Sequence, residues 1–154
     1  TAKLFLWALD YMQKTNDATG KKFFNASRQG VSFPMADALV WILGSIEQIR
    51  DVVRFKEGAA GNPVAAEALP GLAPFFSDLC ALQALAMAGQ VEKLLTELIY
   101  GYTGDLAAAK ASLDTYRAMR AGIEEAMAGQ RQARDRAGHA LTQVSIPEVL
   151  DYPQ

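Results

Sequence analysis

The chain holds few side chains that could bind a metal or carry out a reaction, because it has one histidine, His139, and one cysteine, Cys80. A di-iron site in a helical bundle needs paired glutamates and two Glu-x-x-His motifs that face inward. Asp135 precedes His139 by four residues and would share its helix face. A second histidine is missing from the sequence. We therefore predict no metal site.

Nucleophilic catalysis would have to use His139 as its base, paired with a serine or with Cys80. Cys80 lies in an apolar stretch next to Leu79 and Leu82, a setting typical of a buried and unreactive thiol. His139 lies in a polar segment, where we expect it to be exposed near a helix end. The glycines are scattered singly and not spaced as G-x-G-x-x-G, so the dinucleotide-binding motif is missing. We predict no catalytic residue and no cofactor held by this chain alone.

Arginines gather in the last third of the chain and make it locally basic, although nearby acidic residues partly offset them. Such a run is either a solvated helix face or a surface that contacts phosphates or an acidic protein. The net charge of the whole chain is −2, which implies no general attraction to nucleic acid or anionic lipid. We therefore predict no nucleic-acid partner. We take as the candidate interaction surface Trp41, Arg117, Arg120, Arg131 and Arg134.

The element that must organise these side chains is a helix predicted over residues 33–55. Its large apolar residues recur at steps of four and three, which places six of them on one helix face: Met35, Leu39, Ile42, Ile46, Ile49 and Val53. Partner helices must cover such a stripe, so a charge at its centre, Ile46→Asp, is expected to unfold the domain. Trp41 lies off the stripe and widens the apolar surface. Either other helices surround this one, or one flank faces a partner.

Similar apolar spacing predicts three further helices, over residues 2–15, 74–102 and 106–138. Glycine, proline and asparagine mark the links between helices as connections, including residues 58–74. In the long link over residues 16–32, Phe23 and Phe24 are expected to anchor the crossing against the core. The polar end of the last helix is expected to project past the bundle or to fray.

Strand-like alternation of apolar and polar residues is missing from the sequence. We therefore predict an all-α fold, an up-and-down bundle of about four long helices in a single domain over residues 1–154. Residues 144–154 contain two prolines and are expected to form an extended tail. Because the chain begins with Thr-Ala-Lys, already in a helical pattern, we expect it to be a piece of a longer chain.

The uncharged stretches predict no membrane span, because the longest, residues 79–91, is thirteen residues and a spanning helix needs about 20. The start of the chain shows no signal-peptide pattern. A single cysteine excludes an internal disulfide and fits a reducing compartment. We expect a cytoplasmic protein without a transmembrane segment.

Three segments together resemble the C-terminal helical part of bacterial acyl-CoA dehydrogenase-like flavoproteins: RQGVSFPMADAL (residues 28–39), IRDV (residues 49–52) and TELIYGY (residues 96–102). The resemblance implies a longer parent with an N-terminal helical domain, a middle β-domain and a helical domain that helps to hold FAD. Such a parent oxidises acyl-CoA thioesters, with a glutamate removing the α-proton and the flavin taking the β-hydride. This chain has no segment that matches the catalytic glutamate or the flavin contacts. The resemblance therefore assigns it no catalytic or cofactor-binding residue.

In longer members of that family, an extra C-terminal helical domain is associated with dimer contacts or with the membrane surface. The resemblance implies a non-catalytic domain that packs against the remainder of the parent chain or against a homo-oligomer partner, in an oxidoreductase whose FAD is bound elsewhere. Two alternatives stay open. One is a free-standing helical module that binds another protein through the Trp41 flank or the basic last helix. The other is a small-molecule pocket between helices, lined by Phe75, Phe76, Met87 and Trp41.

Overall fold

The computed structural model describes residues 1–25 and 27–143, and these form five α-helices and one short 3-10 helix. In chain order they are α1 (Ala2–Lys14), α2 (Gln29–Gly58), the 3-10 helix η1 (Ala59–Gly61), α3 (Pro63–Tyr102), α4 (Lys110–Ala126) and α5 (Gln130–Gln143). The described residues contain no strand, only an isolated antiparallel bridge between Asn16 and Lys22. The all-α prediction is confirmed. The predicted tail over residues 144–154 lies outside the described residues.

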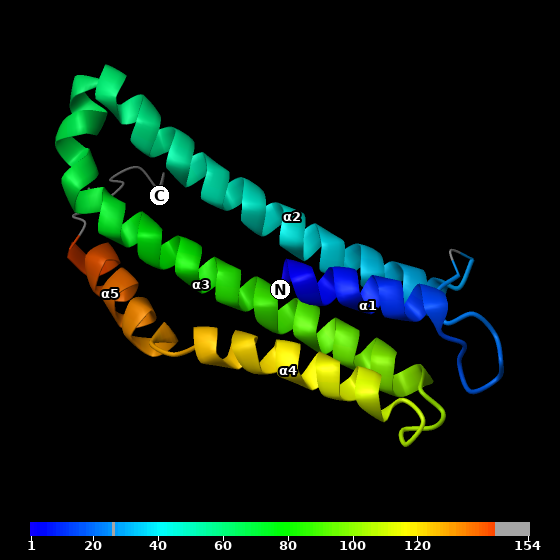
Figure 1. The fold of residues 1–154 in the computed structure, drawn as a ribbon. Coiled ribbons are helices and arrows are strands. Elements are labelled where there is room, and N and C mark those ends of the chain that lie inside the picture. The colour runs from blue at the N-terminus through cyan, green and yellow to red at the C-terminus, as the bar shows by residue number, and fades with distance from the viewer. Residues whose placement is uncertain (26, 144–154) are drawn as a thin grey trace, which may run out of the picture.

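The hydrophobic core lies where α1 and α4 flank the first half of α2 and the second half of α3 (Figure 1). Consecutive helices run in opposite directions through it. Its largest fully buried side chains come from all four helices and from the link after α1: Tyr116, Phe23, Leu4, Met12, Leu95, Ile99, Leu113 and Val31. The anchoring role predicted for two phenylalanines is confirmed, because Phe23 is fully buried and Phe24 packs half-buried against the core.

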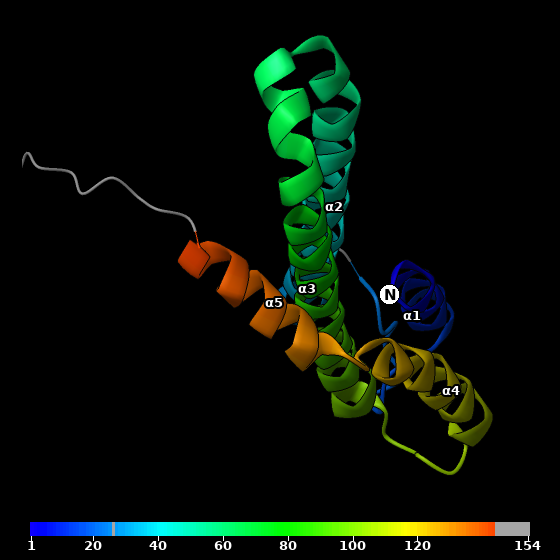
Figure 2. The same ribbon diagram turned by 90° about the vertical axis from the view of Figure 1, so that its left-hand side faces the viewer.

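α2 and α3 pack together as a long antiparallel hairpin whose closed end extends beyond the core (Figure 2). The N-terminal end of α1 lies near the middle of this hairpin, so α1 covers only its inner half (Figure 1). Along the outer half, α5 lies against α3, whereas α2 does not approach α4 or α5 in the described part of the chain. The outer half of α2 is therefore packed against α3 alone.

α3 begins at Pro63 and not at Pro74, so the prediction of a connection over residues 58–74 is wrong beyond Asn62. The Asn62 side chain explains the early start, because its Oδ1 accepts hydrogen bonds from two backbone N–H groups of the first turn at 3.1 and 3.3 Å. Pro63 fits the first helical turn, which needs no donor there. Pro70 and Pro74 lie inside the helix, where each removes a backbone hydrogen bond. Figure 1 shows α3 bending near its start, as such prolines cause.

The helix predicted over residues 106–138 is two helices. Gly129, between α4 and α5, has a φ of 81°, a conformation that glycine adopts readily and L side chains rarely do. α5 contacts α3, which the prediction of a projecting segment did not include, although Figure 2 shows the C-terminal end of α5 pointing away from α3. The reason is that two small side chains one turn apart allow a polar helix to approach closely, and both are buried: Ala133 and Ala137.

Only two of the six residues in the apolar stripe predicted on α2 are buried. Met35 and Ile42 are 5% and 6% exposed. Four other members are 37% to 46% exposed, namely Leu39, Ile46, Ile49 and Val53. The prediction that neighbouring helices hide all six residues is wrong, because α1 covers only the inner half of the α2–α3 hairpin (Figure 1). Other helices therefore do not surround α2, and a partner on its exposed flank stays a prediction.

The segment Pro70–Tyr102 of α3 is long and apolar enough to cross a membrane, judged by length and composition alone. An 18-residue stretch of it has a mean hydropathy of 1.4, and few residues of that stretch are buried within the protein. The prediction based on the longest uncharged run did not anticipate this, because Asp78 and Glu92 interrupt an otherwise apolar helix. Packed helices of proteins outside membranes pass the same test, so it is weak support for a span.

Candidate functional site

Most of the exposed large hydrophobic side chains in the described residues lie on one helix, α2. Four of them lie beyond the buried Ile42, and we call them the outer stripe: Leu43, Ile46, Ile49 and Val53. Ile42, Ile46, Ile49 and Val53 follow one another at steps of four, three and four, as in the seam of a coiled coil. Contiguous exposed apolar residues of this kind are typical of surfaces that bind another protein or a membrane.

Two ion pairs lie on the exposed faces of α2. Arg50 Nη1 donates to Glu47 Oε1 at 2.5 Å, and Arg54 Nη1 donates to Asp51 Oδ1 at 3.2 Å. All four side chains are more than half exposed, so these pairs add little to the stability of the isolated chain. Asp51 lines the groove between α2 and α3, on the far side of α2 from the outer stripe, so the two pairs do not form a charged rim around the stripe.

A second apolar feature of the hairpin is a groove of about 330 Å³ between α2 and α3. The ring centroids of Phe55 and Phe76 lie 5.3 Å apart in an edge-on arrangement on its wall. Cys80 also lines the groove and is half-buried, so the prediction of a fully buried thiol is wrong. The reason is that no further described helix covers this side of the outer hairpin. Cys80 is therefore a natural reporter for anything that covers the groove.

The structure does not gather the predicted interaction residues on one surface. Trp41 is 38% exposed on α2, whereas the arginines lie on α4 and α5, which α2 does not approach in the described part of the chain. Arg131 and Arg134 are exposed on α5. The role predicted for these residues stays a prediction, but it now concerns two separate surfaces.

The two arginines on α4 are engaged within the chain. Arg117 Nη1 donates to Asp114 Oδ1 at 2.8 Å on the helix surface. Arg120 Nε donates to Glu92 Oε1 of α3 at 2.5 Å and is only partly exposed, so it ties α4 to α3. Contact with an acidic partner would have to compete with these bonds, which makes Arg131 and Arg134 the more accessible pair.

Arg136, which the candidate set did not include, ties α5 to α3. Its Nε and Nη2 donate to the two carboxylate oxygens of Asp78 at 2.9 and 2.6 Å, a bidentate arrangement. The hydrogen bond from this guanidinium holds the pKa of Asp78 below its usual range. His139, one turn further on, is exposed, as the sequence predicted.

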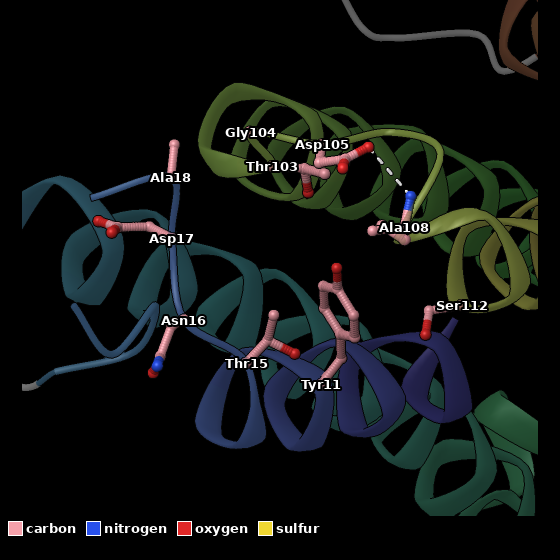
Figure 3. A pocket seen from close by; sticks show the side chains of 11 residues that line it. Tyr11, Thr15, Asn16, Asp17, Ala18, Thr103, Gly104, Asp105, Ala108 and Ser112 are labelled. Atoms are coloured by element: carbon pink, nitrogen blue, oxygen red, sulfur yellow. Dashed lines mark hydrogen bonds between the residues drawn. The ribbon is translucent and has the colours of Figure 1, made fainter. Parts of the chain in front are cut away.

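A polar depression of about 500 Å³ lies at the inner end of the molecule, between the end of α1 and the loop that joins α3 to α4 (Figure 3). Tyr11 of α1 and Thr15, the residue that follows α1, lie across the depression from this loop. Asp105 Oδ1 accepts hydrogen bonds from the backbone N–H groups of Ala107 and Ala108, so this carboxylate caps the turn before α4. The lining groups are hydroxyls, amides and carboxylates engaged in local structure.

Asp17 on the wall of the depression is a structural residue that the sequence analysis missed. Its Oδ1 accepts hydrogen bonds from the backbone N–H and hydroxyl of Thr19 and from the Lys21 N–H, at 2.7 to 3.0 Å. Its Oδ2 accepts from Arg28 Nη2 at 2.5 Å, and the Arg28 guanidinium also lies 4.6 Å from the ring centroid of Tyr102. The hydroxyl of Thr19, then the Arg28 guanidinium, hold the pKa of Asp17 far below its usual range. The Asp-x-Thr-Gly spacing, typical of an Asx turn, was the available signal.

The site features of the described residues are apolar surfaces and structural hydrogen bonds. His/Cys/Asp/Glu side chains do not gather there in groups of three that could hold a metal ion. Comparison of the chain with known protein families, with curated proteins and with solved structures finds no match. The outer stripe is therefore the best-defined candidate site, and its exposed apolar side chains are typical of an association surface.

Proposed function

We propose that this chain is a non-catalytic helical domain that associates with another protein surface through the outer stripe of α2. The observation that carries the proposal is the break in burial along one helix face: Ile42 is 6% exposed, and Ile46, one turn further on, is 37% exposed. The same apolar spacing continues beyond Ile42. The outer stripe therefore has the residue pattern of a buried helix face, although its side chains are exposed. Covering its exposed area is worth on the order of 3 to 5 kcal/mol, taking four side chains each about 40% exposed.

We propose further that the domain belongs to an acyl-CoA dehydrogenase-like flavoenzyme, in which it packs against the catalytic part or against another subunit. Two of the segments that carry the resemblance meet in space, which supports treating them as one packing signature. A Cβ on Gly30 of the first segment would lie 2.9 Å from the Tyr102 hydroxyl of the last segment, so glycine permits this contact. In this proposal the parent chain binds FAD elsewhere and the protein is cytoplasmic.

In the same proposal, the inner half of the molecule is an up-and-down bundle of four helices. The alternating directions of α1 to α4 around one core support this. α5 and the extended α2–α3 hairpin are additions to that bundle, and the additions supply the association surface.

We propose that α3 is a packed helix and does not span a membrane. Asp78 and Glu92 lie within its apolar part, and each is paired with an arginine from a neighbouring helix, Arg136 and Arg120. Single charges inside a bilayer are costly, whereas ion pairs at a helix–helix contact in water are ordinary.

The experiment that tests the proposed function is a binding titration between this chain and the polypeptide encoded upstream of Thr1 in the same reading frame. We expect flavoenzyme sequence upstream, and binding that Ile46→Asp abolishes and Val40→Asp does not. Val40 is 67% exposed on the same helix but off the stripe, which makes it the matched control. An upstream region unrelated to flavoenzymes, or flavin bound by the purified chain alone, would contradict the proposal.

The free-standing interaction module remains the second candidate. The exposed flank of α2 supports both candidates equally. An apolar surface can bind a partner on the same polypeptide or on a separate one. A reading frame that encodes only this domain would favour the second candidate.

A further inference from the structure

The groove between α2 and α3 lies on the opposite face of the hairpin from the outer stripe. Phe55, on the groove wall, comes nine residues after Ile46, about two and a half helical turns, so the two side chains point to opposite sides of α2. The stripe is on the same side as α1, because Met35 and Ile42 of that face belong to the core that α1 also lines. The groove therefore lies on the side of the hairpin away from α1.

α5 brings the end of the described chain to this same side. Arg136 binds Asp78, which falls between the groove residues Phe76 and Leu79 in the sequence, so α5 crosses α3 level with the groove. From that crossing, α5 leaves α3 on the side opposite to α1 (Figure 2). The residues that follow Gln143 therefore start on the face of the hairpin that carries the groove.

We propose that residues 144–154 of this chain cover the groove between α2 and α3. These eleven residues lie outside the described part of the chain, and five of them are large and apolar: Val144, Ile146, Val149, Leu150 and Tyr152. Covering the groove is separate from association through the outer stripe, because the two lie on opposite faces of α2. With the groove covered, the stripe stays open to a partner.

The segment is long enough to reach the groove. Gln143 is seven residues beyond Arg136, about 10 Å along the helix, and a helix with its side chains is about 10 to 12 Å across. The path back along α5 and around one side of α3 is therefore roughly 20 to 30 Å. Eleven extended residues span up to about 36 Å, so the segment reaches the groove.

The groove wall has the composition that an apolar segment needs. Phe55 is exposed although its ring packs edge-on against Phe76. Covering this wall removes apolar surface from water on both partners. Asp51 of the groove and the two acidic residues of the segment, Glu148 and Asp151, carry like charges and must therefore stay in water. The remaining wall residues are Gln48, Val52, Leu79 and Cys80.

Attachment to α5 favours this segment over a free ligand or a second copy. A short covalent link holds a binding segment near its site at an effective concentration on the order of millimolar. A free partner at micromolar concentration would need a much higher affinity for the same groove to displace it.

Cys80 on the groove wall reports whether the groove is covered. The experiment measures, in the full chain, the rate at which N-ethylmaleimide modifies Cys80. The double substitution Val149→Asp and Leu150→Asp should speed the reaction several-fold, because it places two charges in the apolar part of the segment. Ser145→Asp with Gln154→Asp adds the same charge at polar positions and should leave the wild-type rate. Equal rates for wild type and the Val149/Leu150 variant, with helical circular dichroism retained by both, would overturn the inference.

Dilution shows which molecule covers the groove. Protection by the chain's own segment is intramolecular, so the Cys80 rate of the wild type should stay constant over about a hundredfold range of protein concentration. Protection that disappears on dilution would mean that a second copy covers the groove, and would overturn the inference. The proposed function has its own readout, binding through Ile46 on the opposite face, so either can fail while the other stands.

Discussion

Ile42 and Ile46 lie one turn apart on the same face of α2, yet Ile42 is 6% exposed and Ile46 is 37% exposed. The difference arises because Ile42 belongs to the hydrophobic core cluster and Ile46 does not. The boundary between core and association surface therefore falls between two identical side chains on one helix.

This pair gives the first prediction. Ile42→Asp buries a charge without a partner and should lower the free energy of unfolding by more than about 4 kcal/mol, enough to unfold a domain of modest stability. Ile46→Asp keeps its charge in contact with water and should cost about 1 to 2 kcal/mol. Urea unfolding at a concentration where the chain is monomeric measures both. Equal losses from the two substitutions would contradict the assigned boundary.

The second prediction concerns pH and Asp17. Because its pKa is lower in the folded chain than in the unfolded chain, Asp17 contributes stability that is present above pH about 4 and is lost as pH falls toward the folded pKa. Asp17→Asn should therefore lower the melting temperature at pH 7, and its difference from wild type should shrink steadily below pH 4. Asp10→Asn removes only an exposed surface pair with Lys14 and serves as the control. A pH-independent difference between Asp17→Asn and wild type would be the contrary result.

The third prediction uses two glycines. A Cβ on Gly104 would lie 2.4 Å from the Cβ of Ala18 and 2.9 Å from its Cα, so Gly104→Ala forces the two loops apart. We expect a loss of about 1 to 3 kcal/mol in thermal or urea unfolding. Gly89→Ala, in the middle of α3, meets nothing within 4 Å and should instead stabilise by about 0.5 to 1 kcal/mol. If both substitutions shift stability the same way, the close contact between the loops is wrong.

The fourth prediction concerns Ser45 of α2, whose hydroxyl is buried without a hydrogen-bond partner in the described part of the chain. Ser45→Ala removes the desolvated hydroxyl and keeps the helix, so it should raise the free energy of unfolding by about 1 kcal/mol. Tyr116→Phe is the opposite case, because the Tyr116 hydroxyl is bonded to that of Thr96 at 2.6 Å. We expect that substitution to lower stability by about 1 kcal/mol. Destabilisation by Ser45→Ala would reveal a partner for its hydroxyl.

The sequence supported the helical class and the positions of α1, α2 and most of α3, because their apolar residues recur with helical spacing. It misplaced the start of α3, since Asn62 capping outweighed the two prolines that suggested a connection. It also missed the break at Gly129, because a single glycine in a polar segment is compatible with a continuous helix. In both places a single residue, the Asn62 cap or Gly129, sets a helix boundary that the spacing of apolar residues does not indicate.

The candidate site was predictable in composition but not in position. The spacing of Leu39, Ile46 and Val53 shows that these residues share a face, and spacing alone cannot say how far a covering helix extends along it. Trp41 and the arginines were grouped because of their residue types, and the fold separates them onto α2, α4 and α5. Asp17 and Arg28 were overlooked because their contact depends on a loop that sequence periodicity does not describe.

The central claim is that the outer stripe is open in the isolated chain and covered when the protein assembles. Carbene footprinting of Ile46, Ile49 and Val53 tests it directly, in the dilute monomer and in the assembled protein, with Val64 at the exposed hairpin end as the reference. The account predicts labelling of all three residues in the monomer and their selective protection after assembly. Equal labelling of the stripe in both states would contradict it.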